Sequence, residues 1–174
     1  MERPGSPGSR CRPAEVIQAG AGTLAVSMSA AYSLLDRVDW AATTTVPMRP
    51  TGDNDPGRWA RRVFVADSAP AWVKTLLGLR QALVGLIGVR RANPGTVFTV
   101  DRVVHGEALI DTDDTHLHFA AGVRPDAEGG FLHVVTAVEF HSRRGRLYFI
   151  PVRFLHDQVL RSMMTRAVER ELTT

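Results

Sequence analysis

The chain has 174 residues, of which 44% are hydrophobic and 22% are charged, a composition typical of one ordinary globular domain. It has no run of about 18 apolar residues for a membrane span and no Cys/His ladder for zinc fingers. The net charge is only +3 and the densest basic cluster is Arg143, Arg144 and Arg146, so we expect no nucleic-acid partner.

The first 27 residues combine prolines, glycines and isolated charges with almost no large apolar side chains. Such a segment cannot bury enough surface to offset the entropy of ordering. We therefore predict a disordered N-terminal extension over residues 1–27 and a single domain over residues 28–174. The only cysteine, Cys11, lies in this extension and cannot form an internal disulfide, which favours a reducing, cytoplasmic location.

The domain is expected to begin with a short helical turn and a strand over residues 41–48, where β-branched side chains are frequent. Asp55 followed by Pro56 predicts a helix start, because a carboxylate caps free amide groups and proline suits the first turn. A second helix is predicted over residues 71–90. Its apolar face is wider than a surface helix needs. We therefore expect this helix either to cover a cavity as a lid or to contact a second copy of the chain in a homodimer.

From residue 96 the apolar period changes to two, which predicts strands over residues 96–104, 107–112, 115–124 and 130–142. His105 and Gly106 form the first turn of this antiparallel meander. A long helix follows over residues 145–172. Its predicted apolar stripe consists of Tyr148, Val152, Leu155, Val159, Met163 and Ala167.

This order of elements predicts an α+β fold of the helix-grip type. A curved antiparallel sheet wraps around the long C-terminal helix, and two helices lie between the first strand and the meander. Curved sheets that grip a helix often leave an apolar pocket between the two.

Four stretches also carry a family resemblance: DPGRWAR at residues 55–61, AWVKTLLGLR at 71–80, DDTHLHF at 113–119 and HSRRGRLY at 141–148. They resemble an uncharacterised bacterial family of unknown function near the polyketide-cyclase-like or START-like (SRPBCC) superfamily. The resemblance implies a helix-grip fold and a cavity, and it implies no particular reaction. The chain departs from the superfamily in having five predicted strands where seven are usual.

The apolar alternation predicts a cavity between the sheet and the C-terminal helix, which would accept an apolar or amphipathic small molecule and need no cofactor. The predicted lining residues are Phe98, Leu117, Phe119, Val134, Val138, Tyr148, Val152 and Leu155. Two alternatives stay open: a cyclase-like or dehydratase-like enzyme that uses a pocket histidine or tyrosine as acid or base, and a protein-interaction module that uses the helix over residues 71–90.

Polar candidates lie beside this set. His116 and His118 are two residues apart on a predicted strand, and His141 lies near the end of the next one. If Leu117 pairs with Val138, these histidines share the solvent face of the sheet with Glu139; the opposite placement would put them in the pocket.

Neither a metal site nor a fixed role follows from these polar residues. The spacing of the histidines supplies no third ligand, so we predict no metal. Arg146 could orient a ligand together with Tyr148, or it could contact a carboxylate such as Asp111 or Asp113.

Overall fold

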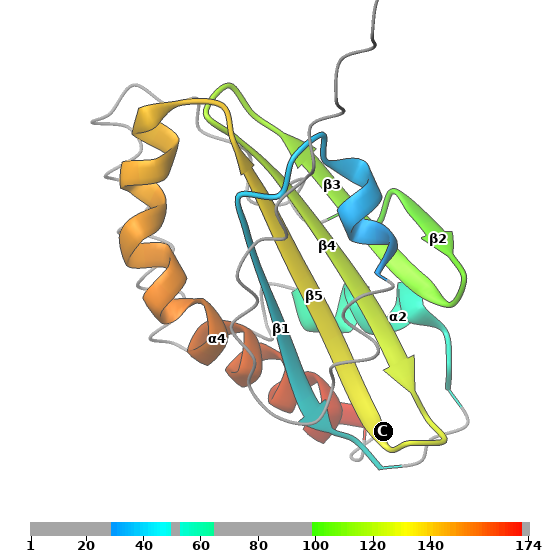
Figure 1. Cartoon of the computed structure of the whole chain (residues 1–174). Coiled ribbons are helices and arrows are strands. Elements are labelled where there is room, and N and C mark those ends of the chain that lie inside the picture. Colours follow the sequence, from blue (N-terminus) through cyan, green and yellow to red (C-terminus); the bar gives the residue numbers. More distant parts are fainter. Residues whose placement is uncertain (1–28, 50–52, 65–98, 172–174) are drawn as a thin grey trace, which may run out of the picture.

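A computed structural model describes residues 29–49, 53–64 and 99–171, which form one antiparallel sheet with helices on both faces (Figure 1). The elements are the 3-10 helix η1 (Ala30–Leu34), β1 (Trp40–Pro47), α2 (Pro56–Phe64), β2 (Arg102–Val104), β3 (Glu107–Asp113), β4 (Leu117–Asp126), β5 (Phe131–Phe140) and α4 (Arg143–Glu171). The strand order is β1-β5-β4-β3-β2. The chain is thus an α+β protein with a five-stranded antiparallel sheet and a long C-terminal helix.

Three of the predictions concern parts of the chain outside the described residues: the N-terminal extension, the helix over residues 71–90, and Phe98. Within the described ranges, no helix has the length and apolar character needed to cross a membrane.

The predicted hairpin turn is confirmed. His105 and Gly106 connect β2 to β3 with φ angles of 49° and 76°. Two central residues with positive φ are typical of the tight turn whose twist matches that of paired strands. In the described residues the strand before this turn is shorter than predicted, because it begins only at Arg102.

The predicted start of α2 is also confirmed. The Asp55 carboxylate accepts hydrogen bonds from the backbone amides of Gly57 (2.9 Å) and Arg58 (3.2 Å), which satisfies two free donors of the first turn. On the buried side of α2, the Trp59 indole donates to the Asp53 carbonyl at 2.9 Å. This bond allows a polar ring nitrogen to lie within the core.

The sheet is packed on both faces, and the larger core lies between the sheet, α2 and the second half of α4. That core consists of Val46, Met48, Trp59, Ala60, Val63, Ala108, Val123, Leu132, Val134, Leu160, Met163, Met164, Ala167 and Val168. On the opposite face, η1 packs through Ala31, and the loop after it through Leu35, against Leu109, Ala120 and Ala137 of the strands. Figure 1 shows η1 and α2 on these two sides of the sheet.

A buried carboxylate fastens η1 to the sheet. Glu107 of β3 is only 1% exposed, and it accepts hydrogen bonds from the Ser29 hydroxyl (2.6 Å) and the Ala30 amide (2.9 Å). Gly122 on β4 makes room for it, because a Cβ atom there would lie 1.9 Å from the Glu107 Oε1. This glycine is therefore required by a close approach rather than by its backbone angles.

The helix α4 begins two residues earlier than predicted, because Ser142 caps it. The Ser142 hydroxyl accepts a hydrogen bond from the Gly145 amide at 3.1 Å. In Figure 1 the helix changes direction along its length, so that its first half flanks β1 and its second half lies near α2.

The predicted apolar stripe of this helix is wrong in its first half. Phe149 is buried there rather than Tyr148, and Leu155 is 37% exposed. The half-buried His156 occupies the inward position instead, with its ring 5.0 Å from that of Trp40. Because histidine reads as polar, the periodicity favoured a stripe rotated by one residue. Further along, Met163 and Ala167 are buried as predicted.

Candidate functional site

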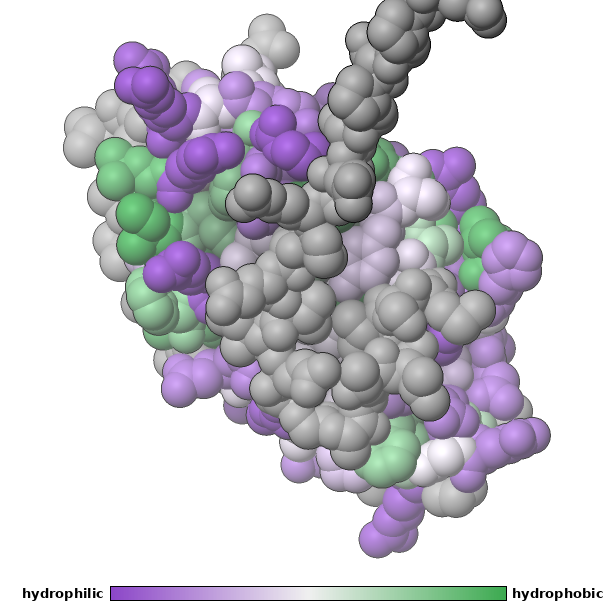
Figure 2. All heavy atoms as spheres, in the orientation of Figure 1, coloured by the Kyte–Doolittle hydropathy of each residue, from purple (hydrophilic) through white to green (hydrophobic). Residues whose placement is uncertain are grey.

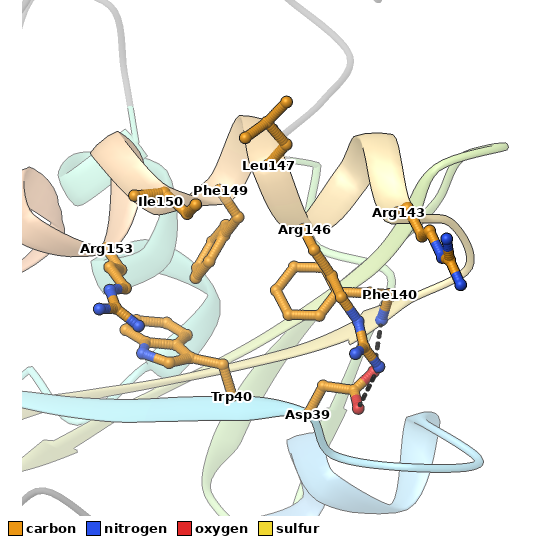
Figure 3. Close-up of a pocket in the computed structure, with 9 residues that line it drawn as sticks. All are labelled: Asp39, Trp40, Phe140, Arg143, Arg146, Leu147, Phe149, Ile150 and Arg153. Carbon is orange, nitrogen blue, oxygen red and sulfur yellow. Dashed lines mark hydrogen bonds and ion pairs between the residues drawn. The ribbon is translucent and has the colours of Figure 1, made fainter.

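The first half of α4 and the adjacent ends of β1 and β5 enclose an open groove of about 530 Å³ (Figure 3). Its lining residues are Asp39, Trp40, Phe140, Arg143, Arg146, Leu147, Phe149, Ile150 and Arg153. The site therefore joins the start of the first strand to residues about 100 positions later in the chain.

Three aromatic rings form the floor of the groove, each from a different element. The Phe149 ring lies edge-on to Trp40 at a centroid distance of 4.8 Å and to Phe140 at 5.3 Å. Figure 3 shows Phe149 pointing from α4 toward the strands, between the other two rings. Edge-to-face contacts of this kind stabilise the arrangement by about 0.5–1.5 kcal/mol each beyond the burial of area.

A carboxylate at the end of the groove is held as an anion. Asp39 accepts hydrogen bonds from the Phe140 amide (2.8 Å) and the Arg37 guanidinium (2.9 Å), and its other oxygen lies 3.6 Å from the Arg146 guanidinium. Burial alone would raise the pKa of the Asp39 carboxyl, but these hydrogen bonds and the two arginine charges lower it below its usual value. The carboxylate in turn positions Arg146, whose guanidinium lies 5.9 Å from the centre of the Phe140 ring.

The rim of the groove carries an excess of positive charge. Arg143, Arg146 and Arg153 all line it and are exposed, whereas Asp39 is the single carboxylate of the lining. Figure 3 shows the three arginines spread along the groove rather than gathered at one point. An anion bound over the aromatic floor would therefore meet a guanidinium group at either end.

Apolar side chains complete the rim. Leu147 and Ile150 line the groove and are 70% and 48% exposed. Figure 2 shows apolar side chains at the left edge of the molecule, where α4 lies in Figure 1, with hydrophilic side chains among them. Pro151 lies within α4 and has no backbone N–H. The Leu147 carbonyl, one turn earlier, therefore lacks its usual intrahelical donor and is a polar group beside the apolar rim.

Behind the floor, His156 is an uncharged histidine. Burial lowers the pKa of its imidazole to about 4, and the nearby charge of Asp157 offsets this only in part. Its Nδ1 atom is buried and has no hydrogen-bond partner among the residues that the structure describes. The ring therefore packs against Trp40 as a neutral, largely apolar group.

None of the predicted cavity residues that the structure describes lines this groove. Phe119 pairs with Val138 on the sheet face that α4 and α2 cover, and Val134 is part of the packed core there. Leu117 lies opposite Phe140, while Tyr148 and Val152 are half-buried on α4. Of all the predicted site residues that the structure describes, one, the polar candidate Arg146, is part of the groove lining.

The histidines lie on the other side of the sheet. The register considered for these strands, with Leu117 opposite Val138, differs by two residues from the observed one, in which Leu117 pairs with Phe140. A shift of two leaves each side chain on the same face, so His118 and Glu139 share a face in both registers, and in the structure they lie directly opposite each other. That face is the one covered by η1, since Ala120 and Ala137 on it pack against η1.

The contacts of the polar candidates also differ from those predicted. Arg146 approaches Asp39 rather than Asp111 or Asp113. The two latter carboxylates instead contact histidines: Asp111 lies 2.6 Å from His118, and Asp113 lies 2.8 Å from His141. His116 contacts the Ser142 hydroxyl at 3.1 Å.

The sequence contained one signal for the residues that were missed. Trp40 and Phe140 lie at the ends of two strands, and Phe149 lies in the second turn of α4, after an arginine-rich first turn. Aromatic side chains at strand ends, beside an arginine cluster, would be consistent with an anion-binding groove. Their proximity, however, follows only from the pairing of Trp40 with Val138.

Comparison with known proteins adds a family. A family model described as "Protein of unknown function (DUF2867)" matches residues 34–163, which include every lining residue of the groove. No curated protein and no solved structure shows a significant match to the chain.

Proposed function

The chain belongs to the family described as "Protein of unknown function (DUF2867)", and from its groove we propose that it binds an amphipathic small molecule with an aromatic or apolar body and an anionic group. The observation that carries the proposal is the aromatic floor bordered by Arg143, Arg146 and Arg153. We propose no catalytic step.

Each part of such a ligand would meet a matching surface. Its apolar body would cover Trp40, Phe140 and Phe149, and removal of that area from water favours binding by roughly 25 cal/mol per Å². Its anion would contact a guanidinium, which can offer two parallel N–H donors to a carboxylate, sulfonate or phosphate. A few polar groups around an apolar surface are the usual composition of small-molecule sites.

The proposal includes a helix-grip relationship to the START-like superfamily. An antiparallel sheet with a long C-terminal helix packed against it supports this relationship. In the proposed arrangement the ligand lies between that helix and the edge of the sheet, rather than in the centre of the sheet where Val134 is packed.

Two fluorescent probes that share one skeleton test the proposal. Anilinonaphthalene sulfonate has an aromatic body and an anion, whereas phenylnaphthylamine has the same body without the sulfonate. We expect the full-length protein to bind the sulfonate probe at one site and more tightly than the neutral probe, by a margin that narrows as ionic strength rises.

Arginine variants provide the matched comparison. Arg146→Ala and Arg153→Ala should each weaken binding of the sulfonate probe by about 2–5-fold, the equivalent of roughly 0.5–1 kcal/mol for one solvent-screened charge contact. Arg144→Ala is the control, because Arg144 is exposed on the same turn of α4 and is not part of the lining. The affinity for the neutral probe should change little in any of these three variants.

A substitution that fills the groove tests its location. Ile150→Trp should weaken binding of both probes, whereas Phe154→Trp, at an exposed apolar position outside the lining, should not. Thermal melting of each variant checks that the fold is intact. Equal affinity for the two probes would refute the anionic class of ligand, and unchanged binding in Ile150→Trp would refute the groove as the site.

A further inference from the structure

We propose that Asp113, His118 and His141 form a binding site for a divalent transition-metal ion such as Zn²⁺. One donor atom from each of these side chains lies within 4.8 Å of the donor atoms of the other two. The cluster lies on the sheet face opposite α4 and shares no residue with the groove. It is therefore a second site, independent of the proposed ligand.

The fold brings the three ligands together from three strands. Asp113 ends β3 and pairs directly with His118 of β4, so both side chains project from the same face of the sheet. His141 follows the last residue of β5, and its amide donates to the His116 carbonyl at 3.0 Å, which fixes the backbone there. The site exists only when β3, β4 and β5 are correctly paired.

The distances are compatible with a shared ion after a small closure. Bonds of about 2.0–2.2 Å from a metal to nitrogen and oxygen place two donor atoms roughly 3 Å apart. The Asp113 Oδ1 and His141 Nε2 atoms are already 2.8 Å apart. Because Asp113 and His141 are both exposed, rotation of their side chains can bring them to the third ligand.

A fourth residue orients one of the ligands. The Asp111 Oδ1 atom lies 2.6 Å from His118 Nε2, within hydrogen-bond distance. A carboxylate on one ring nitrogen holds the imidazole in a single orientation and raises the basicity of the other nitrogen, as in many metal-bound histidines. We assign Asp111 as a positioning residue of the site, and His118 then binds the ion through Nδ1.

The donor set indicates the class of metal. Two imidazoles and one carboxylate suit Zn²⁺ and other divalent transition metals, whereas Mg²⁺ and Ca²⁺ prefer a shell of oxygen atoms. Three protein ligands leave at least one coordination position for water or an anion, as in zinc sites that are open to solvent.

Calorimetric titration of the chelator-treated, full-length protein with Zn²⁺ is the first test. We expect one Zn²⁺ per chain and no comparable binding of Mg²⁺. His141→Ala and Asp113→Asn should each weaken the binding of Zn²⁺ by at least about tenfold, and Asp111→Asn should weaken it by about 10–100-fold through the orientation of His118.

Two matched controls separate the cluster from other surface groups. His105→Asn changes an exposed histidine in the β2–β3 turn and retains a residue type that tolerates positive φ. Asp114→Asn changes the residue next to Asp113 and keeps an oxygen for the Thr115 amide. Both should bind Zn²⁺ like the wild type.

Thermal melting with and without Zn²⁺ supplies a second readout, because an ion that binds only the folded chain raises its melting temperature. The increase should be the same in the wild type and both controls and smaller in His141→Ala at the same Zn²⁺ concentration. The proposal is overturned if the wild type binds no Zn²⁺, or if the cluster variants bind it as tightly as the controls.

Discussion

Replacement of His156 by phenylalanine should remove a specific part of the acid sensitivity of this protein. His156 lies behind the groove floor with its ring against Trp40, and burial keeps its imidazole uncharged. Phenylalanine keeps a ring at this position but cannot bind a proton. The variant thus separates the protonation of this group from its packing.

The expected magnitude follows from the two pKa values. The imidazole has a pKa of 6.5 in the unfolded chain and about 4 in the folded one. Because the folded pKa is the lower, the unfolded state binds the proton first as pH falls. This contribution to stability is complete above pH 6.5 and is lost progressively toward pH 4. At pH 5 the loss is about 2 kcal/mol, from about 1.4 kcal/mol for each pH unit.

Urea unfolding at pH 7 and pH 5 measures the effect in both proteins. Any difference at pH 7 reflects the change in packing, so only the change with pH is informative. We expect the unfolding free energy of the wild type to fall by about 2 kcal/mol more than that of His156→Phe. Burial also lowers the pKa of His133, but this contribution is present in both proteins and cancels. Parallel losses in the two proteins would show that His156 is not held uncharged, and the reasoning would fail.

Two further substitutions test the packing. Leu160→Ala should lower the unfolding free energy by about 2–5 kcal/mol, because Leu160 is only 5% exposed. Leu155→Ala should lower it by less than about 1 kcal/mol, because Leu155 is 37% exposed. Similar losses for the two variants in urea unfolding would contradict the observed buried face of α4. Gly122→Ala should cost at least about 1–3 kcal/mol, because its Cβ atom would overlap the buried Glu107 carboxylate. Gly129→Ala is the control, since the three atoms nearest to its Cβ atom all belong to the side chain of Asp126 in a surface turn, which can move aside. Equal melting temperatures for the two variants would contradict the close approach at Gly122.

Local features of the fold could be predicted because short-range chemistry determines them. The cap at Asp55 and the turn at His105 and Gly106 involve neighbouring residues whose conformational preferences are strong. The alternation places Phe119 and Val138 on one face both in the register considered from the sequence and in the observed one, because the two differ by two residues and a strand has a period of two.

The groove could not be predicted in the same way, because contacts between distant segments create it. Trp40 meets Phe149 only after β1 has paired with β5 and α4 has packed beside them. Periodicity says which side of a helix is apolar, but it cannot show that a histidine will occupy the inward position. For the same reason, only the pairing of β3 with β4 shows that Asp113 lies beside His118 and completes the proposed metal site.

The most direct test of the proposed ligand site uses the indole N–H signals of the tryptophans in a nitrogen-labelled sample of the whole chain. Trp40 lines the groove, whereas Trp59 is buried in the core beneath the sheet and donates to the Asp53 carbonyl. The chain has three tryptophans, so Trp40→Phe and Trp72→Phe variants together assign all three signals. On titration with anilinonaphthalene sulfonate, the Trp40 signal should shift progressively to saturation while the Trp59 signal stays in place. A Trp40 signal that does not move at saturating probe, or a shift at Trp59 of the same size, would contradict the groove as the binding site.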